Sequence, residues 1–127
     1  IMANGTIAFD TLSTSGQIDG TARSIDTDYL LNGSAKCWNK TAADGASIED
    51  SFNITSLTDT GTGAQTHNIN NDMANDDYAP QLTQIASTDF QAVAINNIAT
   101  GSFRGNMFDA SALRDEKQSV VVFGELA

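Results

Sequence analysis

Basic residues are scarce in this sequence of 127 residues, where six lysines and arginines stand against sixteen aspartates and glutamates, for a formal net charge of −10. The basic residues are scattered along the chain, at Arg23, Lys36, Lys40, Arg104, Arg114 and Lys117. Nucleic-acid binding needs a clustered basic face that releases counterions from phosphates. We therefore expect no nucleic-acid partner, and an anionic membrane surface would repel the chain.

Cysteine and histidine occur once each, as Cys37 and His67. One cysteine cannot form an intrachain disulfide, and the two residues together cannot supply the usual ligands of a zinc site. We interpret Cys37 as a small buried hydrophobe. No apolar run approaches the roughly 20 residues of a membrane span. The sequence predicts no cofactor and no membrane insertion.

Aromatic residues form only 7% of the chain, so the supply of large core side chains is thin. Ser, Thr, Asn, Asp and Gly fill many of the remaining positions, a composition that favours short strands joined by turns over long helices. The length fits one domain, which would bury about two-thirds of its unfolded surface. A subunit interface would add burial that such a monomer lacks.

The stretch SFNITSLTDTGTGAQTHNIN, residues 51–70, predicts a hairpin. Phe52 and Ile54 alternate with polar neighbours, as in a strand with one wet face. The two glycines of TDTGTG predict a bulged turn before the return strand. His67 has the parity of Gln65 and Ile69, which places it on the inward face or at a subunit contact. We interpret it as structural, because no motif supplies the orienting carboxylate and nucleophile of a catalytic site.

Further short runs read as strands, at 6–12, 28–38, 78–86, 90–96, 102–108 and 119–123. The closing SVVVFGEL places apolar groups on both faces, which predicts either a central strand or one covered by another chain. Strands at this spacing predict an all-β protein, an antiparallel β-sandwich of jelly-roll-like type. We assign residues 21–127 to the sandwich and residues 1–20 to an extended N-terminal arm.

Carboxylates leave two chemical alternatives open. Pairs of acidic side chains serve glycoside hydrolysis, although sequence does not give their separation. Asp72, Asp76 and Asp77 offer oxygen ligands for calcium, but their spacing is not that of an EF-hand loop, and the same residues are ordinary turn formers.

The stretches GTIAFDTLSTSGQI, YLLNGSAKCW, DSFNITSLTDTGTG and DMANDDYAP, with the closing VVVFG, resemble a module of tailed-bacteriophage virion proteins. That module is frequent in tail fibres and other surface structural proteins of marine phages. The resemblance spans nearly the whole chain, from residue 5 to residue 124. It implies a non-enzymatic, all-β, trimeric domain on the virion surface, in contact with other virion proteins. The chain departs from the pattern at Met73, which lacks the usual following proline, and at His67 and Ile69, where Val and Phe are common.

Host attachment is the first functional hypothesis: an exposed tail-fibre or head-fibre receptor-binding module whose loops meet host surface glycans. The candidate ligand-contact residues are Asp59, Thr60, Asn71, Asp76, Asp77 and Tyr78. Trp38 is a further aromatic side chain that could stack on a sugar, with burial in the core as its alternative. Three identical sites would bind a surface by avidity.

Capsid decoration is the alternative, a cementing role in which the N-terminal arm reaches a neighbouring subunit. The candidate subunit-interface residues are Ile7, Phe9, Leu12, Val121 and Phe123. A hydrolase that shortens host polysaccharide is a third hypothesis. The resemblance favours a protein that is not an enzyme.

Overall fold

Two facing antiparallel β-sheets form the body of the protein in a computed structural model, which describes residues 16–19, 24–85, 91–109 and 112–127. The elements are β1 (Gln17–Asp19), β2 (Ser24–Asp26), α1 (Thr27–Gly33), β3 (Cys37–Thr41), β4 (Ile48–Phe52), β5 (Ile54–Gly61), β6 (Ala64–Ile69), β7 (Ala79–Ile85), β8 (Gln91–Ala99), β9 (Ser102–Asp109), β10 (Ala112–Leu113) and β11 (Lys117–Phe123). The predicted all-β antiparallel sandwich is confirmed, while the jelly-roll type stays a prediction.

The first sheet has the strand order β4-β3-β11-β7. The second contains β5-β6-β9, with β8 and β10 also paired to β9. Strand β11 lies between β3 and β7, so the central position expected for the closing apolar run is correct. Val120 and Val122 of this strand are buried between the sheets, whereas Val121 and Phe123 point to the opposite face and are partly buried.

The chain passes from the first sheet to the second at Asn53, which separates β4 from β5 and has a φ of 55°. The sequence predicted one continuous strand here with Phe52 and Ile54 on the same inward face, and that prediction is wrong. The left-handed residue breaks the alternation, because it redirects the backbone between the two side chains. Ile54 is consequently buried, at 8% exposure, while Phe52 is 55% exposed.

The bulged hairpin predicted within residues 51–70 is confirmed for residues 54–69. Strands β5 and β6 pair, and their register shifts between Asp59 and Gly61. Gly61 and Gly63 have φ values of 127° and 68°, which glycine adopts without the steric penalty of a Cβ atom.

Apolar side chains from both sheets meet at one half of the interior. The cluster comprises Cys37, Ile54, Ile69, Met73, Tyr78, Phe103, Val120 and Val122, with Ile48, Leu82 and Ile95 packed against it. Its burial supplies the main favourable free energy of folding for the sandwich.

Polar side chains fill much of the other half of the interior. Asn39, Thr41, Gln65, His67 and Gln118 are each no more than 1% exposed. The Gln118 side-chain amide donates to Gln65, and the backbone N–H of Gln118 donates to Thr41 Oγ1 over 3.1 Å. These hydrogen bonds join β3, β6 and β11 and offset part of the cost of removing the polar groups from water. Within the described part of the chain, the Asn39 side-chain amide, Gln65 Nε2 and His67 Nδ1 are buried without a hydrogen-bond partner.

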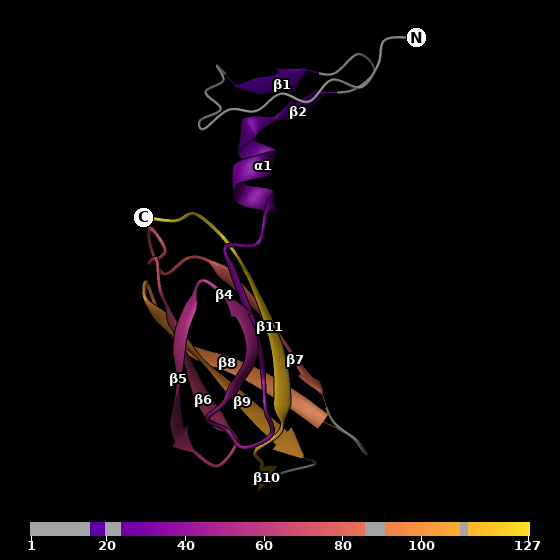
Figure 1. Cartoon of the computed structure of the whole chain (residues 1–127), viewed down its shortest axis with the longest axis vertical. Helices are drawn as coiled ribbons and strands as arrows, with labels where there is room; N and C mark the ends of the chain where they lie inside the picture. The colour runs from indigo at the N-terminus through magenta and orange to yellow at the C-terminus, as the bar shows by residue number, and fades with distance from the viewer. Residues whose placement is uncertain (1–15, 20–23, 86–90, 110–111) are drawn as a thin grey trace.

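A short stalk precedes the sandwich. We define the stalk as β1, β2 and α1, and Figure 1 shows it projecting from the end of the sandwich at which the C-terminus lies. The sequence predicted a strand over residues 28–38, but residues 27–33 are helical. Asp26 begins the helix, because its side chain accepts a hydrogen bond from the backbone N–H of Asp28 over 3.0 Å.

The predicted arm lies mostly outside the described residues. The expected strand over 6–12 and the expected interface residues Ile7, Phe9 and Leu12 all fall there. The first strand of the sandwich begins at Cys37, so α1 and β2 lie within the range assigned to the sandwich by sequence.

Candidate functional site

An apolar row crosses the outer face of the first sheet. Phe52 of β4 is paired with Trp38 of β3, and Trp38 is paired with Val121 of β11. Residues that pair directly across antiparallel strands place their side chains on one face. Phe52 is 55% exposed and Trp38 is 37% exposed. We call Phe52, Trp38 and Val121 the aromatic strip.

Polar side chains border the aromatic strip. Gln81 of β7 pairs with Val121 and so continues the row. The next row holds four polar residues in cross-strand register: Asp50, Lys40, Ser119 and Thr83. Lys40 forms an ion pair with Glu49, with 2.9 Å between Nζ and Oε2, and Glu49 also pairs with Lys117. The strip is therefore a narrow apolar surface beside hydrogen-bonding groups.

Trp38 lies on this outer face because Cys37, Asn39 and Thr41 take the inward positions of β3. Two of these inward residues are polar, so hydrophobicity alone does not indicate which face of the strand is inside. The sequence consequently left both a core and a surface position open for Trp38. The exposure of Phe52 was missed, since its only signal was the tolerance of Asn53 for a left-handed backbone.

Helix α1 exposes large apolar side chains and buries none of its residues. Tyr29 is 77% exposed, Leu31 is 63% exposed and Leu30 is 47% exposed. Ile25, just before the helix, is 42% exposed. Residues 28–33 were predicted to be part of a strand, so an exposed helix was not expected here.

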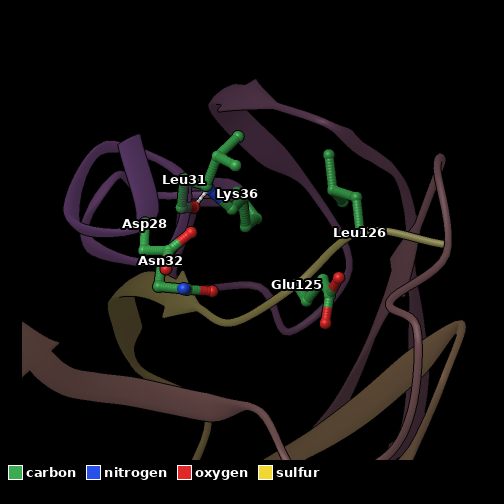
Figure 2. A pocket seen from close by; sticks show the side chains of 6 residues that line it. All are labelled: Asp28, Leu31, Asn32, Lys36, Glu125 and Leu126. Carbon is green, nitrogen blue, oxygen red and sulfur yellow. Dashed lines mark hydrogen bonds between the residues drawn. The ribbon is translucent and has the colours of Figure 1, made fainter. Parts of the chain in front are cut away.

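A pocket of about 310 Å³ lies where the stalk meets the C-terminal segment, and Figure 2 shows the side chains around it. Asp28, Leu31, Asn32, Lys36, Glu125 and Leu126 line it. The Lys36 ammonium donates to the backbone carbonyl of Leu31 and to Ser34 Oγ, the latter over 2.8 Å. A cation at this position stabilises the negative end of the helix dipole. Lys36 thereby attaches the end of α1 to the beginning of β3.

The predicted ligand-contact residues lie at two ends of the sandwich. Asp59 and Thr60 belong to the β5–β6 hairpin, where Thr60 Oγ1 donates to the carbonyl of Ala64 over 2.9 Å. Asn71 lies at the other end of β5, where its backbone N–H donates to Asn53 Oδ1 over 2.8 Å. The length of β5 and β6 separates the two groups, so they do not form one site.

The remaining three predicted residues follow Asn71 in the loop before β7. Asp76 and Asp77 are exposed. Tyr78 is only 6% exposed, and its hydroxyl lies 2.9 Å from the backbone carbonyls of Ala99 and Ser102. The prediction that Tyr78 contacts a ligand is therefore wrong, because its ring packs in the core.

His67 is fully buried in the polar half of the interior. Its Nε2 lies 3.3 Å from Gln118 Oε1. Burial lowers the pKa of His67 from 6.5 to about 4, and the hydrogen bond with Gln118 offsets only part of that effect. The side chain is thus held neutral inside the sandwich, where it is not accessible to a substrate dissolved in the surrounding water.

Acidic clusters give no metal site in the part of the chain that the structure describes, where no group of three or more His, Cys, Asp or Glu residues could hold a metal ion. Asp44 instead binds its own loop. Hydrogen bonds from the Ser47 side chain and from the backbone N–H groups of Ala46 and Ser47 lower its pKa from 3.8 to about 2. No helix among the described residues has the length and apolar character to cross a membrane.

Comparisons with known proteins add no relative: no family model matches the chain, and neither a curated protein nor a solved structure does. Two surfaces thus remain as candidates, the aromatic strip on the sandwich and the apolar helix of the stalk.

Proposed function

We propose that this protein is a non-enzymatic structural module of a tailed-phage virion surface, which assembles as a homotrimer through its stalk and displays the sandwich for host attachment. The sequence resemblance supports the virion setting. The exposed apolar helix α1 is the single observation that supports assembly.

A helix of seven residues needs outside contacts to persist. Isolated helices shorter than about 12 residues are marginal in water, and most helices in proteins are stabilised by packing of an apolar face. Helix α1 buries none of its residues against the rest of the described chain. A partner chain that covers Tyr29 and Leu31 would supply this packing and remove apolar surface from water.

The arrangement of the apolar residues favours three copies over two. Successive residues of an α-helix are rotated by about 100°, so Tyr29, Leu30 and Leu31 together span about 200° of the helix surface. A pair of helices in a dimer buries one stripe on each helix. In a three-fold bundle each helix lies between two neighbours, which covers a wider arc.

Light scattering coupled to size-exclusion chromatography tests this assembly. We expect the wild-type protein to have three times the chain mass, and the double variant Leu30→Lys, Leu31→Lys to have the mass of one chain with an unchanged β-type circular dichroism spectrum. The control is Phe52→Lys, which changes an equally exposed apolar side chain on the sandwich and should remain trimeric. A wild-type protein that is monomeric at tens of micromolar, or a trimeric double variant, would refute assembly through the stalk.

Capsid decoration is the second candidate function, and the projecting stalk also supports it. A stalk that extends beyond the sandwich could lie across a neighbouring capsid subunit. Removal of residues 2–33, which takes away the whole stalk, should then abolish binding to purified phage heads while the sandwich, which begins at Cys37, stays folded. Full decoration by the truncated protein would contradict this role.

A further inference from the structure

The aromatic strip on the outer face of the first sheet has the features of a carbohydrate platform. We propose that Phe52, Trp38 and Val121 bind a neutral glycan by stacking against the C–H faces of its sugar rings. This inference deepens the proposed attachment function, on which it rests, by naming the site and the chemistry of the ligand.

The strip lies on hydrogen-bonded strands of one sheet. Its three residues come from three adjacent strands, β4, β3 and β11, in direct cross-strand register. Neighbouring strands are about 4.8 Å apart, so the strip extends for about 10 Å across the sheet. That length accommodates two linked hexose rings. Trp38 and Phe52 are both exposed, and the faces of aromatic rings carry a negative potential that attracts the partially positive C–H hydrogens of a sugar.

Hydrogen-bonding groups lie where sugar hydroxyls would emerge. Gln81 follows Val121 at the end of the strip and is exposed. Asp50, Ser119 and Thr83, in the adjacent row, are also exposed. Together they offer amide, carboxylate and hydroxyl groups, which are able both to donate to and to accept from hydroxyls. An apolar surface with a few polar groups beside it is the usual composition of a small-molecule site.

The size of the strip argues against a second copy of the chain as its occupant. The exposed parts of Trp38 and Phe52 amount to roughly 200 Å². A stable protein interface buries about 800 Å² on each partner, and its fully buried centre is depleted of charged residues. Here the adjacent row carries Asp50 and the Lys40–Glu49 ion pair. The apolar area suits one or two sugar rings instead.

Charge selects a neutral glycan. The chain has a net charge of −10, so an anionic polysaccharide would be repelled at long range. Lys40, the cation of the adjacent row, is already paired with Glu49. A neutral polysaccharide meets no such penalty.

Fluorescence provides a direct test, because Trp38 is the only tryptophan in the chain. The full-length protein is titrated separately with soluble dextran, mannan, galactan and laminarin, with alginate as the anionic comparison. We expect at least one neutral polysaccharide to change the emission of Trp38, and alginate to leave it unchanged. Retardation in native gels that contain the same polysaccharide provides a second measure of binding.

Variants then assign the binding to the strip. Trp38→Ala and Phe52→Ala should each weaken gel retardation by roughly ten-fold, the equivalent of one lost stacking contact. Trp38→Phe should retain most of it. Leu113→Ala is the control, because it removes an apolar side chain of comparable exposure, 45%, that lies in β10 of the second sheet, apart from both the strip and the stalk. Thermal unfolding of each variant verifies that it folds. If Trp38→Ala does not fold, the gel retardation of Phe52→Ala and the fluorescence titration of the wild-type protein still test the site.

Three results would overturn the inference. These are an unchanged emission with every neutral polysaccharide, binding to alginate alone, and a loss of binding in Leu113→Ala equal to that in Trp38→Ala. The oligomeric mass of the same samples separates the two proposals. A trimer without a response refutes the glycan site and leaves the assembly in place, whereas a monomer that responds refutes the assembly and leaves the glycan site.

Discussion

The imidazole of His67 lies flat on the ring of Phe103, with 4.8 Å between the ring centroids and 7° between their planes. Phe103 is paired with His67 across β9 and β6, and both side chains are fully buried. Gln118 contributes the polar contact from the facing sheet. Burial favours the neutral imidazole, because an imidazolium would lose its hydration without gaining a carboxylate partner.

We predict that acid weakens the fold through His67. Its folded-state pKa is about 4 and its unfolded-state pKa is 6.5, so the unfolded chain binds the additional proton between these values. The free energy of unfolding should therefore fall as the pH is lowered from 6.5 to about 4, by roughly 3 kcal/mol, and should lose no more from this group below pH 4. Denaturant unfolding at pH 7 and pH 4.5 measures the difference.

His67→Gln is the control, because glutamine does not titrate. Its free energy of unfolding should vary less over that window than that of the wild-type protein. Asp44 does not affect this comparison. The stability that arises from its lowered pKa is fully present above pH 3.8 and is lost only as the pH falls toward 2. An equal pH dependence in the wild-type protein and in His67→Gln would refute the role of His67.

Asn53 should be one of the most sensitive positions outside the core. Its side chain donates to the carbonyls of Lys36 and Asn71 and accepts from the backbone N–H of Asn71, while its backbone has a φ of 55°. Asn53→Ala loses the hydrogen bonds and strains the backbone, which together should cost about 3 kcal/mol of unfolding free energy. Asn53→Gly loses the hydrogen bonds only and should cost about half as much. Equal stabilities of the two variants would show that backbone strain at the corner is unimportant.

Asn53 also shows why the sequence predicted the strands better than their faces. Composition and alternation located most strands, including the hairpin and the central β11, since these depend on local propensity. The corner depends on hydrogen bonds to Lys36 and Asn71, which are 17 and 18 residues away. A local pattern does not contain that information, so Phe52 was placed on the wrong face.

The candidate site was predicted only in part, for a similar reason. Trp38 was recognised as a residue that could stack on a sugar, but its partner Phe52 was not. The interior polar row is also non-local, since Gln118 reaches Gln65 and His67 from more than 50 residues away. Because the amide side chains of Asn39, Gln65 and Gln118 occupy inward positions, the polarity of a residue did not indicate which face of its strand is exposed to solvent. Helix α1 was not predicted, because its Tyr and Leu residues are compatible with a strand as well as with a helix. Asp26, a typical N-cap residue, was the local signal that indicated a helix.

Gly63 should tolerate no side chain. A Cβ atom there would lie 2.6 Å from the backbone N of Arg114 and 2.7 Å from the backbone O of Met107, at a φ of 68°. Backbone atoms of two paired segments cannot move aside as a flexible side chain can. We expect Gly63→Ala to lower the unfolding free energy by about 3 kcal/mol. The comparison is Gly33→Ala, where the space is open and the residue is helical, and which should be neutral or stabilising by up to about 1 kcal/mol.

Cys37 should report the opening of the core. Its side chain is fully buried, and burial raises the pKa of its thiol from 9.0 to about 11. Because the thiolate is the reactive form, an aromatic disulfide reagent at pH 8 should label native protein far more slowly than denatured protein. Labelling then requires opening of the pairing between β3 and β11, since Cys37 faces Val122 across these strands. The labelling rate should consequently rise in Asn53→Ala and Gly63→Ala in proportion to their loss of stability, when reclosing is faster than reaction. A native-state rate equal to that of the denatured chain would mean that β3 is not held in the centre of the sandwich.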